Sequence, residues 1–159
     1  MYDTEAAFSR SLSSKLAHAG LYVQRLESHG TGNGIPDMFI MGHGFDCFLE
    51  LKNSNKKGSG DRICVPWRPG QQAWMHSYYF AHECKKCCVT LMSINSGVVV
   101  IPMTKVYENN VVEKAFIVTW DQWSKLQLDQ FIRDVSECMV PNEALKKHMC
   151  STPTASIDS

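Results

Sequence analysis

Apolar residues recur at helical spacing at the start of the chain. Between residues 3 and 19, Phe8, Leu12 and Leu16 fall on one face of a helix, and polar side chains fill the other face. Gly20 follows as a stop signal. The pattern predicts an amphipathic helix that packs its apolar face against the rest of the protein.

Glu5 lies in the centre of that apolar face. A carboxylate in a first helical turn stabilises the positive end of the helix dipole, which is the usual role of such a residue. A carboxylate on a packing face can instead point inward to meet a cation. The pattern alone leaves both interpretations of Glu5 open.

Three short runs with strand character follow the helix, over residues 21–26, 35–41 and 45–51, and a glycine-rich loop at 28–34 separates the first two. The third run alternates cleanly between apolar and mixed positions. Its two faces are Phe45, Cys47, Leu49 and Leu51 on one side and Asp46, Phe48, Glu50 and Lys52 on the other.

The pattern beyond residue 52 begins with a polar segment, 53–68, that is rich in lysine and glycine and is predicted to be a loop. The elements predicted after it are a helix over 69–83, strands over 87–94 and 98–103, an edge strand within 111–119, and helices over 121–140 and 142–148.

This order of elements predicts an α/β protein with a central mixed sheet flanked by helices. A chain of 159 residues is the length of one domain. We expect a single domain over 1–150, with a core over about 3–103, a helical C-terminal region over about 104–150, and a flexible polar tail over 151–159.

The predicted hairpin between the second and third strands brings charged residues together. A two-residue turn at His43-Gly44 places Asp37 directly opposite Glu50, and Lys52 shares the face of Glu50. Two facing carboxylates repel each other unless a cation neutralises them, and carboxylate oxygens suit Mg²⁺ or Mn²⁺. The alternative is an exposed, polar edge of a strand, and the residues alone do not decide between the two.

Composition narrows the class of protein. Hydrophobic residues make up 44% of the chain and charged residues 20%, as in ordinary globular proteins. No apolar run is long enough for a membrane span, and the first residues lack the features of a secretory signal. Seven scattered cysteines, an odd number, indicate free thiols and a reducing, cytoplasmic compartment. A membrane partner is not expected.

Charge is distributed unevenly although the net charge is zero. Residues 1–51 carry three basic and six acidic groups, whereas residues 52–86 carry seven basic and two acidic groups. Early acids that bind metal beside a basic segment that meets phosphate would explain this asymmetry. A solvated, lysine-bearing loop would explain it equally simply.

The cysteine-rich stretch from His82 to Cys88 is a weaker candidate for chemistry. It contains Cys84, Cys87 and Cys88, but a zinc site needs four ligands and no second pair stands at a diagnostic spacing. Cys87 and Cys88 begin an apolar strand, where buried thiols are common. Buried thiols are therefore the favoured interpretation.

The segments Gly34-Ile35-Pro36-Asp37 and Glu50-Leu51-Lys52 together resemble the signature of the PD-(D/E)XK nucleases. The stretch from Arg68 to Trp74 is similar to the P-x-Q-x-x-W helix start of VRR-NUC-type and related phage nucleases, and the layout of residues 3–103 resembles archaeal Holliday junction resolvases. The resemblance implies a restriction-endonuclease-like core with the order αβββαβ.

The resemblance also implies roles for individual residues. Asp37 and Glu50 correspond to the metal-binding acids and Lys52 to the catalytic lysine, while Glu27 is an alternative to Glu5 as the third acid. The implied catalytic set is Glu5, Asp37, Glu50, Lys52 and Gln71, and the implied metal ligands are Glu5, Asp37, Glu50 and the backbone carbonyl of Leu51.

The function that the resemblance implies is a Mg²⁺- or Mn²⁺-dependent DNA endonuclease with no small-molecule cofactor. A phage-type resolvase of branched DNA is the preferred subtype, and it would act as a homodimer because two strands must be cut. A monomeric nicking or repair nuclease and a non-catalytic DNA-binding protein are the alternatives. The predicted DNA contacts are His29, Lys56, Lys57, Arg62 and Arg68.

Overall fold

The computed structural model describes most of the chain, namely residues 2–26, 34–54, 62–68, 70–102, 111–113 and 116–149. The side chains of residues 62, 63 and 111–113 are not described. The predicted tail at 151–159 lies outside the described residues. None of the described helices is both long enough and apolar enough to cross a lipid bilayer.

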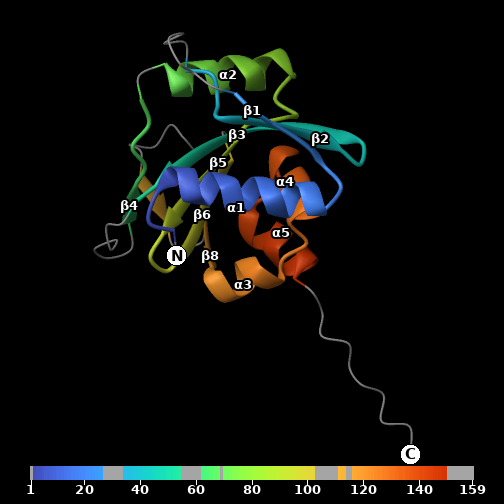
Figure 1. Ribbon diagram of the computed structural model, residues 1–159. Coiled ribbons are helices and arrows are strands. Elements are labelled where there is room, and N and C mark those ends of the chain that lie inside the picture. Colours follow the sequence, from blue (N-terminus) through green and yellow to red (C-terminus); the bar gives the residue numbers. More distant parts are fainter. Residues whose placement is uncertain are drawn as a thin grey trace, which may run out of the picture.

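A six-stranded mixed sheet forms the centre of the protein (Figure 1). Its strand order is β1-β2-β3-β5-β6-β8, and β3 pairs with β5 in parallel while every other pair is antiparallel. The strands are β1 (Tyr22–Arg25), β2 (Met38–Gly42), β3 (Phe45–Asn53), β5 (Val89–Ile94), β6 (Gly97–Pro102) and β8 (Ile117–Thr119).

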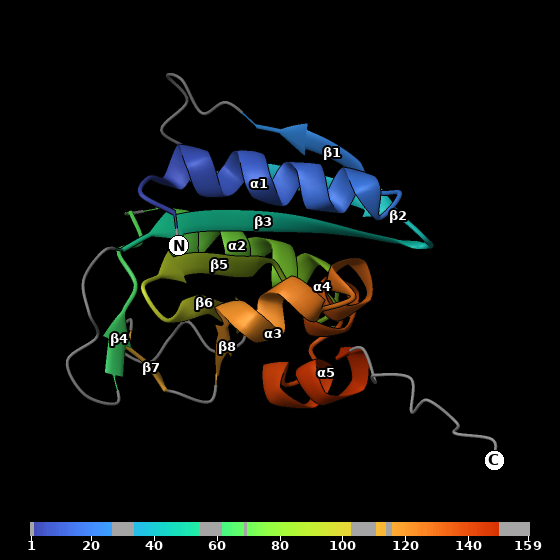
Figure 2. The same cartoon turned by 60° about the horizontal axis from the view of Figure 1, so that its bottom comes forward.

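Helices cover both faces of this sheet (Figures 1 and 2). They are α1 (Glu5–His18), α2 (Gln71–Ala81), α3 (Trp120–Lys125), α4 (Leu128–Ser136) and α5 (Pro141–His148). On one face, Phe8 and Leu12 of α1 share a buried cluster with Phe131 of α4. On the other, Met75 of α2 packs in a second cluster with Met92 of β5. The predicted mixed sheet flanked by helices, with further helices at the C-terminal end, is confirmed.

The hairpin between β2 and β3 has the register that the sequence predicts. Gly42 pairs with Phe45, and the ladder runs back to Met38 opposite Leu49. His43 and Gly44 form the turn with φ of +50° and +80°, which is the geometry that matches the twist of the two strands. The register therefore brings Asp37, which precedes Met38, to the level of Glu50.

Two predictions about the loops need correction. The segment 53–68 is not entirely loop, because β4 (Arg62–Cys64) pairs with β7 (Val111–Glu113) in a separate two-stranded sheet. The predicted edge strand within 111–119 is accordingly divided, and only β8 joins the edge of the main sheet. Strands β4 and β7 are far apart in the chain, so their pairing produces no local pattern in the sequence from which it could be predicted.

The C-terminal helical region is fixed by a buried polar cluster. Asp134 of α4 accepts hydrogen bonds from Lys147 Nζ at 2.7 Å and pairs with His148 Nε2 at 2.6 Å. Burial acts to raise the pKa of Asp134, but its bonds to Lys147 and His148 outweigh burial and lower that pKa.

The predicted long helix over 121–140 is wrong in one respect, because it is interrupted at Leu126-Gln127 between α3 and α4.

Candidate active site

Asp37 is held at the point where β2 begins. Its carboxylate Oδ2 accepts a hydrogen bond from the backbone N–H of Leu51 at 2.8 Å, and its carbonyl oxygen accepts one from Leu26 N–H at 2.8 Å. These contacts tie the half-buried Asp37 to β3 on one side and to the end of β1 on the other. The side chain is therefore fixed against the backbone of the Glu50-Leu51-Lys52 segment.

Glu50 and Lys52 lie on one face of β3 and are both buried, with 0% and 4% of their surface exposed. Lys52 Nζ donates a hydrogen bond to Glu50 Oε1. The other oxygen, Glu50 Oε2, is buried and has no hydrogen-bond partner within the part of the chain that the structure describes. A buried carboxylate oxygen without a partner is costly, and a bound cation would remove that cost.

The electrostatic environment of Glu50 disfavours its charge. Burial, followed by the negative charge of Asp37, raises the pKa of Glu50 to about 7, although the nearby Lys52 acts in the opposite direction. The two carboxylates thus repel each other across the hairpin, as the register requires. This repulsion is the condition in which a divalent cation binds favourably between acids.

Gln71, the first residue of α2, completes the surroundings of Glu50. Its side-chain Nε2 donates a hydrogen bond to Glu50 Oε1 at 2.5 Å, and its Oε1 accepts one from the backbone N–H of Arg68 at 2.8 Å. Gln71 is the glutamine that the resemblance implies for the site, and its amide contacts Glu50. Its amide is oriented at both ends, so it holds one Glu50 oxygen in place.

A close backbone contact joins the two sides of the site. A Cβ atom built on Gly34 would lie 2.3 Å from the carbonyl oxygen of Gly70 and 2.7 Å from Gln71 N. Gly34 and Gly70 both have positive φ, of +69° and +88°. Glycine is thus required at position 34 both by conformation and by space. The contact fixes the segment leading to Asp37 against the start of α2.

Glu5 lies at the rim of a small cleft of about 110 Å³, which is lined by Glu5, Ala6, Ser9, Arg25, Asp37 and Leu51. Glu5 is exposed, unlike its buried neighbours Phe8 and Ser9, but it lines the same cleft as Asp37. Glu5 nevertheless interacts with the other acids. Partial burial and the charge of Asp37 raise the pKa of Glu5, against the opposing charge of Lys52.

Arg25 is the residue of this cleft that the sequence analysis missed. It ends β1 and lines the cleft beside Glu5 and Asp37. One feature of the sequence could have pointed to Arg25. Strand alternation places Arg25 on the same side of β1 as Val23, and Val23 packs against the core. Arg68 is exposed, and its positive charge also acts on Glu5. Two arginines therefore accompany the acids.

Several predicted residues cannot be placed. His29, Lys56 and Lys57, and the alternative acid Glu27, lie outside the described residues. Arg62 begins β4, but its side chain is not described. Of the predicted DNA contacts, Arg68 alone has a described side chain, and the others remain predictions from the sequence.

Metal-binding geometry is not preassembled in the described residues. No group of three or more His, Cys, Asp or Glu side chains among them is arranged to hold a metal ion. This applies both to the set Glu5, Asp37 and Glu50 and to the cysteine-rich stretch, in which Cys87 and Cys88 are buried and Cys84 is exposed. The acids come from three separate elements, so small side-chain movements would be needed to bring them onto one ion.

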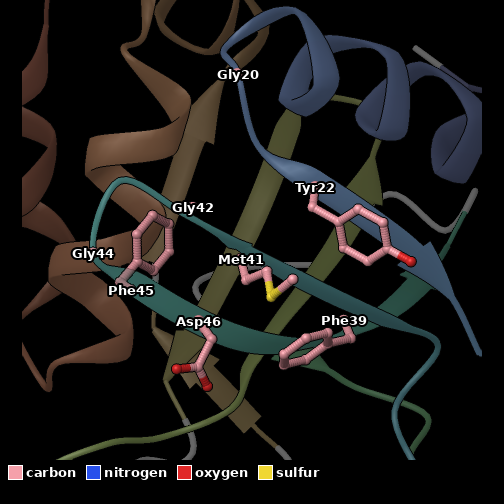
Figure 3. Close-up of a pocket in the computed structure, with 8 residues that line it drawn as sticks. All are labelled: Gly20, Tyr22, Phe39, Met41, Gly42, Gly44, Phe45 and Asp46. Carbon is pink, nitrogen blue, oxygen red and sulfur yellow. The ribbon is translucent and has the colours of Figure 1, made fainter.

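A larger hollow, of about 620 Å³, lies elsewhere on the surface, over the β1–β2 hairpin. Figure 3 shows Tyr22, Met41 and Phe39 side by side on its floor, with Asp46 at one side. Among the described residues that line it, Asp46 is the one carboxylate, and it forms an ion pair with Lys86 at 2.5 Å. Of the two hollows, the smaller cleft is the one that contains Glu5 and Asp37 and adjoins the Glu50-Leu51-Lys52 segment through Leu51.

Comparison with known proteins adds evidence on the fold. No family model and no curated protein matches the sequence. Among solved structures, the chain is similar to Hjc, a Holliday junction resolvase from the archaeal hyperthermophile Archaeoglobus fulgidus, with a TM-score of 0.51. The chain has a restriction-endonuclease-like fold. The match covers 69% of this chain and 87% of the resolvase at 13% identity, so the likeness concerns the fold alone.

Proposed function

We propose that the protein is a Mg²⁺- or Mn²⁺-dependent endonuclease that hydrolyses phosphodiester bonds in DNA. The observation that carries the proposal is the meeting of Asp37, Glu50 and Lys52 at one end of the β2–β3 hairpin, with Glu50 Oε2 buried and, among the described residues, unpartnered. A structural ion pair alone would leave no reason for a second buried carboxylate oxygen without a partner.

The donor set fits a hard divalent cation. Carboxylate oxygens of Glu5, Asp37 and Glu50, and the backbone carbonyl of Leu51, would hold it. When bound, the ion supplies Lewis-acid polarisation of the phosphate and a more acidic water. Among the described residues, the cleft offers oxygen ligands and no thiol or imidazole, which favours Mg²⁺ or Mn²⁺ over zinc.

The protein's own groups would orient the two carboxylates and neutralise negative charge on the phosphate. In the reaction, a water oxygen bonds to phosphorus, one ester P–O bond breaks, and an alcohol and a phosphate monoester remain. Lys52 supplies positive charge beside the attacked phosphate, where negative charge develops. Gln71 keeps Glu50 Oε1 occupied, and Asp37 is oriented by Leu51 N–H. These contacts orient Asp37 and one oxygen of Glu50 before the metal ion and the DNA bind.

Branched DNA is the preferred substrate in this proposal, with a homodimer as the acting form. The supporting observation is the shared fold with a protein described as a Holliday junction resolvase. Resolution of a junction needs two symmetric cuts, which two copies related by a two-fold axis provide. The positive residues Arg25 and Arg68 beside the cleft suit a phosphate backbone.

The test is a cleavage assay on labelled duplex, single-stranded, flap and four-way-junction DNA, with Mg²⁺, Mn²⁺ or EDTA. We expect cleavage with either ion, none with EDTA, and the highest rate on the junction. Lys52→Ala, Asp37→Ala and Glu50→Ala should each lower the rate by at least about a hundredfold. Asp46→Asn is the matched control, because Asp46 lies on the same face of β3 but pairs with Lys86.

The outcomes separate the alternatives. Cleavage of nicked or flapped duplex in preference to the junction would support a repair or nicking nuclease. Salt-sensitive DNA binding without any cleavage, unchanged in the Lys52→Ala variant, would indicate a non-catalytic DNA-binding protein. Robust Mg²⁺-dependent cleavage by the Asp37→Ala protein would refute the site assignment.

A further inference from the structure

Three thiols meet at the opposite end of α2 from Gln71. Cys84 lies in the turn that follows α2, Cys138 in the turn that follows α4, and Cys87 just before β5. The Cys138 thiol donates a hydrogen bond to the carbonyl oxygen of Cys84 at 3.7 Å. Burial raises the pKa of Cys138, and the neighbouring thiols of Cys87 and Cys84 also act on that pKa. Turns from two distant segments are therefore in direct contact through Cys138.

The three thiols differ in their access to solvent. Cys84 is exposed, Cys138 is partly buried and Cys87 is completely buried. Cys87 is further enclosed because its thiol donates to the carbonyl oxygen of Val135 at 3.4 Å and its N–H to Ser136 O at 2.8 Å. A dissolved reagent would thus reach Cys84 first, and Cys138 is the adjacent thiol that could respond.

The backbone at both cysteines is unusual. Cys84 and Cys138 have φ of +61° and +70°, a left-handed conformation that residues other than glycine rarely adopt. Both therefore lie outside the helices that precede them, so each side chain can turn without breaking a helical hydrogen bond. Left-handed residues of this kind commonly terminate helices, and here they place both cysteines in the turns after α2 and α4.

We propose that Cys84 and Cys138 form a reversible disulfide in response to low-molecular-weight disulfides. The Cys84 thiolate attacks one sulfur of the small disulfide, which releases one small thiolate and leaves a mixed disulfide on Cys84. The Cys138 thiolate then attacks the Cys84 sulfur and releases the second small thiolate. Two protein thiols are oxidised, their two protons are taken up by the two released small thiolates, and the small disulfide is thereby reduced to two thiols.

The bond would join the end of α2 to the end of α4, across 54 positions of sequence. A crosslink over so long a segment restricts the unfolded chain and stabilises the folded one. In the reducing compartment that the cysteine usage indicates, the dithiol form prevails, and the disulfide forms under oxidising conditions. This inference does not depend on the proposed nuclease activity.

The test treats the full chain with oxidised glutathione and maps disulfides by mass spectrometry of peptides under non-reducing conditions. We expect a Cys84–Cys138 peptide pair that dithiothreitol removes, and a higher denaturation midpoint for the oxidised protein. Cys84→Ser and Cys138→Ser should each abolish the pair and the shift in midpoint. Cys64→Ser is the matched control, because Cys64 is exposed but lies on β4, and it should keep both.

The proposal is overturned by three results. One is glutathione attached to Cys84 without closure onto Cys138 at any ratio of oxidised to reduced glutathione. Another is a disulfide that pairs Cys138 with Cys87 in place of Cys84. The last is an oxidised Cys84→Ser protein that shows the same rise in denaturation midpoint as the unmodified sequence.

Discussion

Gln71 donates its side-chain hydrogen bond to the same Glu50 oxygen that accepts one from Lys52. Two donors on Oε1 fix the orientation of the carboxylate and leave Oε2 as the oxygen available to a ligand. The glutamine thus acts on Glu50 from another element, since α2 and β3 are separated by the polar segment and β4. Gln71 is best described as a positioning residue.

Replacing Gln71 tests this role. In Gln71→Ala, Glu50 loses one of its two donors and gains rotational freedom, so we expect the Mg²⁺ concentration for half-maximal cleavage to rise about tenfold or more. The measurement is a metal titration of the cleavage rate. Ser77→Ala, an exposed position on α2 whose hydroxyl donates to Ala73 O within the helix, is the control and should leave the titration unchanged. Equal titrations for Gln71→Ala and the unmodified protein would contradict the positioning role.

The third acid can be identified by comparing two glutamates. Glu5→Gln keeps the size of the side chain and the first turn of α1 but removes a negative charge that interacts with Asp37. We expect the fold to persist and the cleavage rate to fall by at least about tenfold, with partial recovery at high Mn²⁺. If instead Glu5→Gln cleaves normally and Glu27→Gln does not, the third ligand is Glu27.

The metal-free protein should lose stability as pH rises. The pKa of Glu50 is about 7 in the folded protein and near its ordinary 4.5 when unfolded, so the folded state binds the proton more tightly. Stability from this group is greatest below pH 4.5 and falls as pH rises through 7, by at most roughly 3 kcal/mol. Urea unfolding in EDTA at pH 5 and pH 8 measures the difference.

Two variants isolate the contribution of Glu50 to that pH dependence. Glu50→Gln cannot ionise, so its free energy of unfolding should fall less between pH 5 and pH 8 than that of the unmodified protein. Glu83→Gln replaces an exposed glutamate paired with Lys85 and should keep the original slope. Identical slopes for all three proteins would show that Glu50 is not the group responsible.

The glycine contact can be tested with a pair of matched substitutions. Gly34→Ala and Gly44→Ala both place a side chain at positive φ, but a Cβ on Gly34 would clash with Gly70 whereas one on Gly44 has nothing within 4 Å. Both should lose about 1–2 kcal/mol of stability from backbone strain. Only Gly34→Ala should also lose cleavage activity, by about a hundredfold, because the two sides of the site shift apart. Equal activity losses in the two variants would refute the positioning effect.

The hairpin that carries the site could be predicted because its signals are local. Alternation along β3 assigns Glu50 and Lys52 to one face, and the His43-Gly44 turn fixes which residue opposes which. The two-residue repeat of side-chain direction along a strand, combined with a two-residue turn, is enough to place Asp37 opposite Glu50. The same reasoning could predict α1, because Phe8 and its partners repeat at helical spacing.

Contacts between distant segments could not be predicted in this way. The bond from Gln71 to Glu50, the place of Arg25 in the cleft and the pairing of β4 with β7 depend on how separate elements meet in space. The exposure of Glu5 shows the same limit, because helical periodicity assigns a residue to a face but does not say where the neighbouring sheet ends. Glu5 is exposed because it is the first residue of α1, at the end of the helix.

The contact of Gly34 with Gly70 closes the chain between them into a loop whose two ends both lie beside the site. This loop contains Asp37, Glu50 and Lys52, and it also contains the lysines predicted to bind DNA. Because β3 and β4 are each paired with another strand on either side of residues 55–61, we expect a change in the number of residues there to leave Asp37, Glu50 and Lys52 in place. Under the proposed function, DNA binding by the lysines of this segment and hydrolysis at Asp37, Glu50 and Lys52 would then be separable, and the segment would be the place to introduce a different DNA preference.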